Sequence, residues 1–359
     1  MHGNKLTSVN VFLTVCLIVA IVFPSYIQAA PKKYTVAWSI YAGWMPWDYA
    51  GYSGILQKWA EKYGIEIELV RMDYIPSIEA FVAQQVDACV MTNMEALDMP
   101  ASSGIDSTVL IVGDYSNGND AILTRENLGI KNLPGNDIYL VELSVSHYLL
   151  GRALDMNGLK ESDMTLINTS DSDIGPVFLS DESQKVVITW NPIVMEIEQT
   201  PGVSKIFTSA DIPGEILDLM VVNTEALNEN PDFGKALVGA WYEVMDVMSK
   251  QDVAADDALA FMAESAGASL ENYKQQLSTT AMFYTPQEAV EYIKSDDIKA
   301  KMNFVRQFCF EHGLLGESAP AVDVVGIFYP DGSTQGDANN IKMRFEAAYM
   351  ELAAAGKLE

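Results

Sequence analysis

Residues 34–49 read Tyr-Thr-Val-Ala-Trp-Ser-Ile-Tyr-Ala-Gly-Trp-Met-Pro-Trp-Asp-Tyr. The first seven have the β-branched and aromatic character of a strand, and a glycine and a proline break the pattern soon afterwards. A loop that leaves the carboxyl end of the first strand of an open α/β sheet lies where such sheets bind ligands. Packing in the core is the alternative role for these rings, but ligand pockets are lined mainly by aromatic and apolar groups. We therefore expect this loop to line a pocket with Tyr41, Trp44 and Trp47.

Short apolar runs continue to alternate with amphipathic stretches after this loop, which is typical of βαβ units and a parallel sheet. In the first set we expect strands at 34–40, 65–72, 87–92 and 107–114. In the second set we expect strands at 136–142, 164–168 and 185–190. The pattern predicts an α/β fold with two lobes, each a mainly parallel sheet flanked by helices.

The predicted lobes are joined by two crossings, near residues 117–125 and 205–218, so that the first lobe is discontinuous. We assign 31–120 and 215–359 to lobe 1 and 121–214 to lobe 2, with a cleft between them that closes by a hinge. We expect an irregular segment from Ser204 to Pro213, a strand at 323–328 and a final helix from Ala338 to Ala355.

The N-terminus carries the pattern of a secretory signal peptide over residues 1–30. It has one lysine, an apolar run of about a dozen residues and the small pair Ala29-Ala30 before the expected cleavage point. The residues around Cys16 do not match a lipoprotein cleavage site. We therefore expect a periplasmic or extracytoplasmic protein that is secreted through this segment.

The chain is strongly acidic. Its formal charge is -27, and it would become -28 without residues 1–30, which hold one lysine and no acid. Nucleic acid is excluded as an expected partner, because phosphate binding needs clustered lysine and arginine. A negative field attracts small cations, although solubility in a saline habitat would explain the same charge.

Residues for catalysis or metal binding are scarce. Beyond residue 30 the histidines are His147 and His312 and the cysteines are Cys89 and Cys309, with no metal-ligand or phosphate-loop motif. We expect the two cysteines to be free and buried rather than bridged. The sequence predicts no catalytic residue, no metal and no cofactor.

Polar side chains gather at the ends of the predicted strands, where they would face the cleft. Asn93 and Glu95 follow the third strand, and Asp114 and Asp120 flank the first crossing. Helix capping explains the first pair and turn formation the second, but pockets also collect a few convergent polar groups. We also expect a strand at 216–223, the return strand, where the chain comes back to the first lobe. In the second lobe and at the return strand the candidates are Glu142, Ser144, Trp190, Glu215 and Asp218.

These motifs together resemble a known family. The secretion signal, the β-α-β-α start, Asp114-Tyr-Ser-Asn-Gly-Asn-Asp120, Trp190-Asn-Pro192 and Ile212-Pro-Gly-Glu215 resemble a type II periplasmic solute-binding protein of an ABC importer. Within that superfamily the chain is similar to the nitrate, taurine and sulfonate branch, and most of all to binding proteins encoded beside urea carboxylase. The resemblance implies a monomer that presents its solute to ABC permease and ATPase subunits.

The same resemblance implies guanidine or a relative as the solute. In anion-binding relatives, the helix that Ser144 would cap receives a sulfonate or nitrate. Here Glu142 precedes that helix, and the cleft loops hold no arginine or lysine. Guanidinium is planar and charged, stacks on aromatic rings and donates paired hydrogen bonds to carboxylates. The open alternatives are a receptor for urea, taurine, an alkylsulfonate or nitrate, and a secreted enzyme on the same fold.

Overall fold

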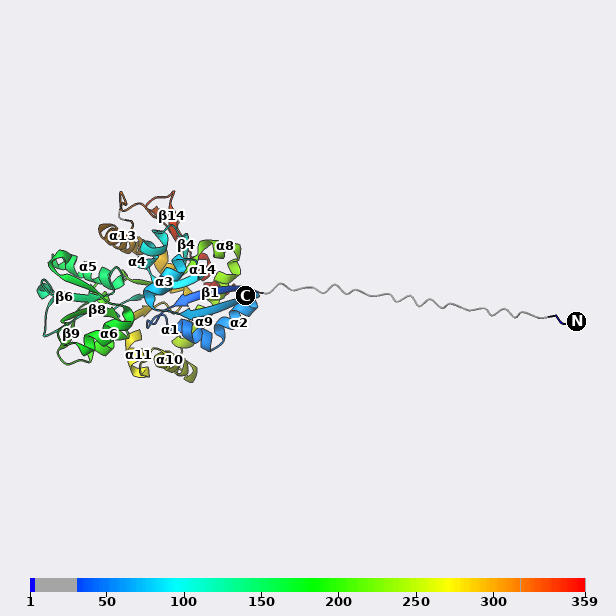
Figure 1. Ribbon diagram of the computed structural model, residues 1–359, viewed down its shortest axis with the longest axis horizontal. Coiled ribbons are helices and arrows are strands. Elements are labelled where there is room, and N and C mark those ends of the chain that lie inside the picture. Colours follow the sequence, from blue (N-terminus) through cyan, green and yellow to red (C-terminus); the bar gives the residue numbers. More distant parts are fainter. Residues whose placement is uncertain (4–30, 317, 359) are drawn as a thin grey trace. The chain divides into compact units, whose positions relative to one another are not determined.

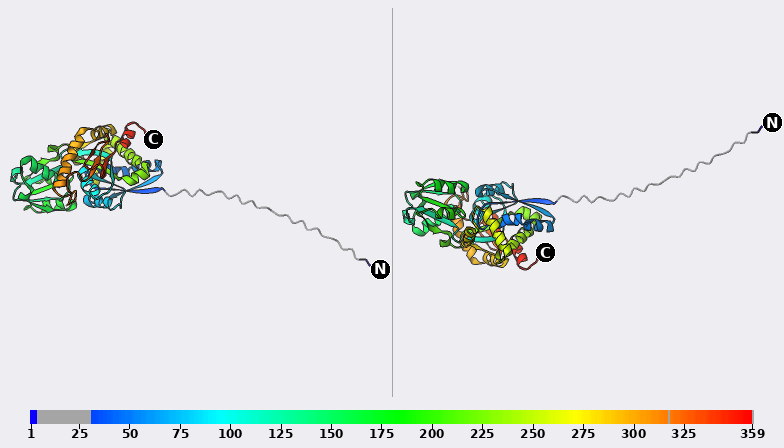
Figure 2. Two further views of the ribbon diagram at one scale, coloured as in Figure 1. Left: turned by 90° about the horizontal axis from the view of Figure 1, so that it is seen from above. Right: turned by 90° about the horizontal axis from the view of Figure 1, so that it is seen from below.

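The computed structural model describes residues 1–3, 31–316 and 318–358 (Figures 1 and 2). Most of the predicted signal peptide, residues 4–30 including Cys16, lies outside the described residues. Residues Lys32–Glu359 form one compact unit. Within the described part of the chain, none of the helices combines the length and the apolar character needed to cross a bilayer.

The strands of this unit form two sheets. In sheet A the order along the sheet is β13 (Thr334–Gln335), β12 (Gly326–Phe328), β14 (Ile341–Phe345), β4 (Ser107–Ser116), β10 (Leu217–Asn223), β3 (Ala88–Thr92), β1 (Lys32–Trp38) and β2 (Ile65–Arg71), with β11 (Thr280–Met282) paired to β4. In sheet B the order is β7 (Thr165–Asn168), β6 (Asp137–Leu140), β8 (Val186–Trp190), β5 (Asp120–Arg125) and β9 (Val203–Thr208). We call each sheet with its helices a lobe; in Figure 1, β6, β8 and β9 lie together, apart from β1, β4 and β14.

Three helices belong to the segment that forms sheet B: α5 (Val145–Asn157), α6 (Asp171–Ser180) and α7 (Ile193–Glu198). The segments that form sheet A carry α1 (Met45–Tyr52), α2 (Ile55–Lys62), α3 (Tyr74–Val82), α4 (Asn93–Ala96), α8 (Thr224–Glu229), α9 (Pro231–Ser249), α10 (Val253–Ser265), α11 (Leu270–Leu277), α12 (Pro286–Ile293), α13 (Asp296–Glu311) and α14 (Ala348–Ala354). A single π-helical turn, Leu97–Ala101, follows α4.

The predicted α/β fold is confirmed. Strands β1, β2 and β3 are parallel neighbours, as are β6, β7 and β8, which is what the strand–helix alternation indicated. Both sheets are nevertheless mixed, because β10 runs antiparallel to β3 and β4, and β5 runs antiparallel to β8 and β9. Strands β4, β5, β9 and β10, which lead into and out of the two crossings, all take part in these antiparallel pairs.

Two local predictions were wrong. Residues 204–213, expected to be irregular, include most of β9. The first part of the expected final helix is instead β14, in which Met343 and Phe345 are buried and α14 begins only at Ala348. In β14, Ile341, Met343 and Phe345 recur at every second residue, the period of a strand, and pairing with β4 and β12 decides between strand and helix.

The two crossings are bonded to each other. The Ser116 hydroxyl, at the end of β4, lies 2.7 Å from the Ser209 hydroxyl, just after β9. The Gly118 N–H donates to the same Ser209 oxygen at 2.7 Å. Because both connections between the lobes meet here, a rotation of one lobe against the other would bend the chain at this point.

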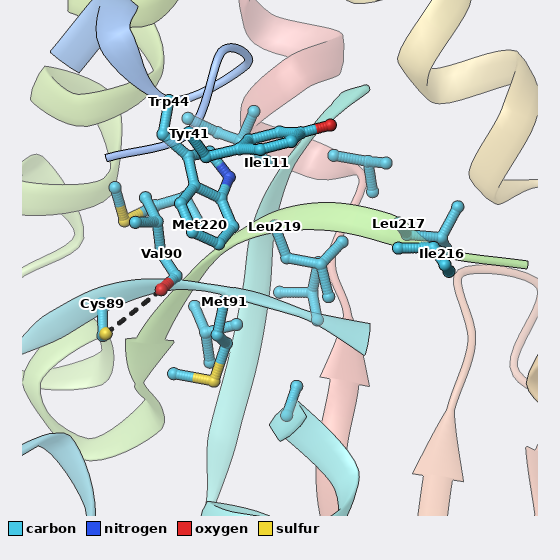
Figure 3. Close-up of a cluster of buried hydrophobic side chains, with 14 of the residues drawn as sticks. Tyr41, Trp44, Cys89, Val90, Met91, Ile111, Ile216, Leu217, Leu219 and Met220 are labelled. Carbon is cyan, nitrogen blue, oxygen red and sulfur yellow. Dashed lines mark hydrogen bonds between the residues drawn. The ribbon is translucent and has the colours of Figure 1, made fainter. Parts of the chain in front are cut away.

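The main hydrophobic core extends through both lobes, from β1, β3, β4 and β10 to the buried face of α5. Figure 3 shows part of it, with Trp44 and Tyr41 above Val90 of β3 and Met220 of β10. Cys89 and Cys309 are both buried and free, as predicted. Their burial raises the pKa of both thiols, so they act as small apolar side chains.

Candidate functional site

A small cavity, partly open to solvent, lies between the two lobes. About 260 Å³ of it is free of protein atoms, the open solvent at its mouth included. From the first lobe and the return segment it is lined by Tyr41, Trp44, Tyr74, Thr92, Ile216 and Asp218, and from the second lobe by Asp120, Val145 and Trp190. The lining includes no lysine, arginine or histidine.

Four aromatic rings form a continuous wall of this cavity. The ring centroids of Tyr41 and Trp44 are 5.1 Å apart, those of Trp44 and Tyr74 5.5 Å, and those of Tyr74 and Trp190 5.6 Å. Trp44 is held in place because it directly precedes α1, whose first turn contains Pro46. The faces of such rings carry the negative end of a quadrupole and attract a desolvated cation.

Two carboxyl groups, those of Asp114 and Asp218, are cross-strand neighbours on β4 and β10. Both residues are buried, and neither oxygen of Asp114 nor Oδ2 of Asp218 has a hydrogen-bond partner among the described residues. Like charges placed opposite each other in a sheet repel. Burial, followed by the charge of Asp114, raises the pKa of Asp218 well above its ordinary value, and burial raises the pKa of Asp114 to about 7.

A third acid reaches the cavity from the second lobe. Asp120 stands opposite Trp190 in the β5–β8 pair and accepts a hydrogen bond from Ser116. Burial raises the pKa of Asp120 to about 7. The Tyr41 hydroxyl accepts from Asn119 Nδ2 at 3.2 Å, and burial together with the three aspartates raises the pKa of Tyr41. The site is therefore a buried group of acids, and none of the described residues that line it carries a positive charge.

Gly43 makes room for the Asp114 carboxyl. A Cβ at this position would lie 2.4 Å from Oδ2 of Asp114 and 2.8 Å from Cε1 of Tyr41. Both atoms belong to side chains that the site needs in place, and neither distance is possible for a real methyl group.

We expect the Gly43→Ala variant to fold but to lose at least about tenfold in solute affinity, since it displaces one charged hydrogen-bonding group. Titration calorimetry and a melting curve measure the two effects separately. Gly129→Ala is the matched control, because a Cβ there would meet only Oδ1 of Asn132, at 3.8 Å. Unchanged solute affinity in Gly43→Ala would show that the Asp114 position does not matter for binding.

Glu95 lies at the edge of the site, and its carboxyl group binds the N-terminus of α5. Its Oε1 accepts a hydrogen bond from the backbone N–H of Val145 at 2.8 Å, and its Oε2 accepts one from Thr92. The positive end of a helix dipole attracts negative charge. Here the anion is a carboxylate of the protein itself, held from the opposite lobe, so an external sulfonate or nitrate would have to displace it.

The structure brings Tyr41, Trp44, Asp120, Trp190 and Asp218 together in the cavity, with Asp114 and Glu95 directly behind its wall. The other predicted residues contact protein groups elsewhere. Trp47 packs in the core on Trp241, Asn93 bonds to the backbone at Glu215 and Leu217, Ser144 caps α5, Glu142 is exposed, and Glu215 is paired with Arg152 and Tyr148.

Four residues that line the cavity were not predicted from the sequence: Tyr74, Thr92, Val145 and Ile216. Tyr74 and Thr92 stand at the carboxyl-end side of β2 and β3, so the rule that selected Trp44 would have found them. Val145 and Ile216 carry no such signal. They are ordinary apolar residues, and only the contact between the lobes places them at the cavity.

His147, Glu161 and His312 form a cluster outside the cavity. Nε2 of His147 lies 2.8 Å and Nε2 of His312 3.0 Å from Oε2 of Glu161, which makes the cluster a candidate metal site. However, Nδ1 of His147 accepts the Leu143 N–H at 3.1 Å, so the proton of a neutral His147 ring is on Nε2 and blocks that atom as a ligand. The arrangement favours a hydrogen-bonded bridge between α5 and the end of α13.

The chain was also compared with known proteins. No family model matches it, and no curated protein does. Among solved structures it is similar to the periplasmic aliphatic sulphonate binding protein SsuA of Escherichia coli, with a TM-score of 0.64 and 18% identity over 79% of this chain and 94% of that one. The alkanesulfonate-binding protein SsuA of Xanthomonas axonopodis pv. citri bound to MOPS gives 0.64 and 14%, over 80% and 96%.

The periplasmic nitrate-binding protein NrtA of Synechocystis PCC 6803 matches with a TM-score of 0.56 and 11% identity, over 90% of this chain and 98% of that one. At such identities the likeness concerns the fold. The chain has the fold of periplasmic solute-binding proteins, and the predicted resemblance to the nitrate, taurine and sulfonate branch is confirmed at that level.

Proposed function

We propose that this protein, which has the fold of periplasmic solute-binding proteins, is the extracytoplasmic receptor of an ABC importer for a small planar nitrogenous cation such as guanidinium. The observation that carries the proposal is that two buried aspartates, Asp120 and Asp218, line a cavity whose lining has no basic residue, with Asp114 buried directly behind its wall. A buried charge is costly unless it is paired. A cation in the cavity supplies the missing pair.

The aromatic wall supports the shape of this solute. A flat guanidinium fits between rings, and its N–H groups point outward in its own plane toward carboxylates. Asp218 comes from one lobe and Asp120 from the other, so a solute that binds both would hold the lobes together. The site serves for capture and release, and the proposal includes no reaction.

An anionic solute is disfavoured by the same residues. A sulfonate or nitrate would enter a cavity lined by carboxyl groups, at a helix start whose backbone N–H is already bound by Glu95. The neighbours whose titles name sulfonate or nitrate share the fold with this chain at 11–18% identity, and their solutes do not follow from that likeness.

The experiment is titration calorimetry of the full mature protein with guanidinium, urea, taurine and nitrate at one pH and ionic strength. We expect guanidinium to bind at least about a hundredfold more tightly than either anion, because a charged partner left unpaired costs several kcal/mol on burial. Tight binding of taurine or nitrate with no response to guanidinium would overturn the proposal.

One observation favours a neutral second candidate, urea. The Trp44 indole N–H is buried and has no acceptor among the described residues. Guanidinium offers no acceptor, whereas the carbonyl oxygen of urea does. With the aspartates protonated, the cavity would suit such a molecule. The same titration separates the two candidates, since urea binding would weaken as the aspartates ionise and guanidinium binding would strengthen.

A further inference from the structure

A second, larger hollow, which we call the outer groove, shares a lining residue with the cavity. It is lined from the first lobe by Ile40, Arg71, Met72, Asp73 and Ala266, and from the second by Asp171, Ser172, Trp190, Pro192 and Ile193, and it has about 990 Å³ of space free of protein atoms, the open solvent at its mouth included. Trp190 is the one residue that lines both this outer groove and the inner cavity.

Trp190 is held firmly as a partition. It ends β8, where it is the cross-strand partner of Asp120, and its ring meets the edge of Tyr74 at a centroid distance of 5.6 Å. Only 6% of the residue is exposed, although it lines both hollows. The Tyr74 N–H donates to Asp171 Oδ2 at 3.2 Å, which ties the two lobes together beside the partition.

The outer groove offers apolar contacts next to Trp190. Ile40 and Met72 line it from one lobe and Ile193 from the other. Its charged groups are Asp73, Asp171 and Arg71, so both signs are present. An alkyl chain that passed the partition would therefore find apolar surface on both sides, and each buried CH₂ would contribute to binding.

We propose that Trp190 is the specificity-determining residue that limits the solute to a small head group and excludes substituents that would extend into the outer groove. This inference rests on the proposed function for the nature of the head group. The size limit itself does not depend on charge. In the intact protein, a solute with an n-butyl substituent would have to displace the indole or remain outside.

The test compares guanidinium with n-butylguanidinium, and urea with n-butylurea, by calorimetry on the wild type, Trp190→Ala, Trp190→Phe and Ile193→Ala. The relevant pair is the one whose parent compound, guanidinium or urea, the wild type binds. Within that pair we expect the wild type to bind the butyl compound at least about a hundredfold more weakly than its parent. In Trp190→Ala the butyl group should gain apolar contacts, and the head group should lose its contact with the indole ring. We therefore expect the ratio of the two affinities, parent to butyl compound, to fall by at least about tenfold.

The other variants are controls. Trp190→Phe retains a ring and should keep most of the discrimination, and Ile193→Ala enlarges only the outer groove and should leave the ratio unchanged. Equal binding of parent and butyl compounds by the wild type, or an unchanged ratio in a folded Trp190→Ala, would overturn the inference. If urea and n-butylurea bind but the guanidinium compounds do not, the proposed cation is wrong. The affinities of urea and n-butylurea then decide the size limit.

Discussion

Asp218→Asn is expected to abolish tight guanidinium binding while leaving the free protein at least as stable as the wild type. The side chain is buried, its Oδ2 has no partner among the described residues, and its pKa is raised well above normal by burial and by Asp114. In the complex this group would accept charged hydrogen bonds, each worth about 1.5–3 kcal/mol, or roughly 10- to 150-fold in affinity. In the free protein the neutral amide replaces a buried carboxyl that can ionise only at a cost.

The opposite directions of these two effects make the experiment informative. Calorimetry gives the affinity and a melting curve gives the stability. The matched control is Asp98→Asn, because Asp98 is also buried, has an unpartnered Oδ1 and a raised pKa caused by burial and Glu95, but does not line the cavity. A lower melting temperature with unchanged affinity in Asp218→Asn would identify that carboxyl as structural.

The second large effect is on pH dependence. Binding of guanidinium should strengthen as the pH rises from about 5.5 to about 7.5, by up to about tenfold per pH unit for each proton released. The reason is that burial raises the pKa of both Asp114 and Asp120 to about 7 in the free protein. The cation favours the ionised carboxylates, whereas guanidinium itself stays charged throughout this range.

The stability of the free protein should change in the reverse sense. An acid whose pKa is higher in the folded than in the unfolded state destabilises the fold once it must ionise, so stability falls between about pH 4 and about pH 7 and the loss is complete above that. Calorimetry in two buffers with different ionisation enthalpies counts the protons released. Guanidinium affinity that is constant or falls over this interval would contradict the assignment of the aspartates to the site.

Much of the fold could be predicted from local pattern. The alternation of strands and helices gave the α/β class, and α5 begins directly after Ser144, the residue expected to cap it, and ends before Gly158. Strands β5 and β9 were missed. Strand β5 pairs with β8 and β9, both distant in sequence, and this tertiary pairing makes β5 and β9 strands.

For the site, the sequence by itself determined the chemical inventory: rings after β1, acids at the first crossing and on the return strand, and a tryptophan at the end of β8. The tertiary structure decided which of them meet. The register of β4 against β10 places Asp114 opposite Asp218, and the contact between the lobes brings Asp120 and Trp190 to Trp44, while Trp47 turns into the core against Trp241.

The physical reason is that a residue's type is local, whereas its neighbours are set by strand pairing and lobe closure between segments far apart in the chain. A glutamate such as Glu95 offers the same carboxyl group wherever it lies. Only the packing of α4 against the start of α5 turns it into the protein's own anion at a helix terminus.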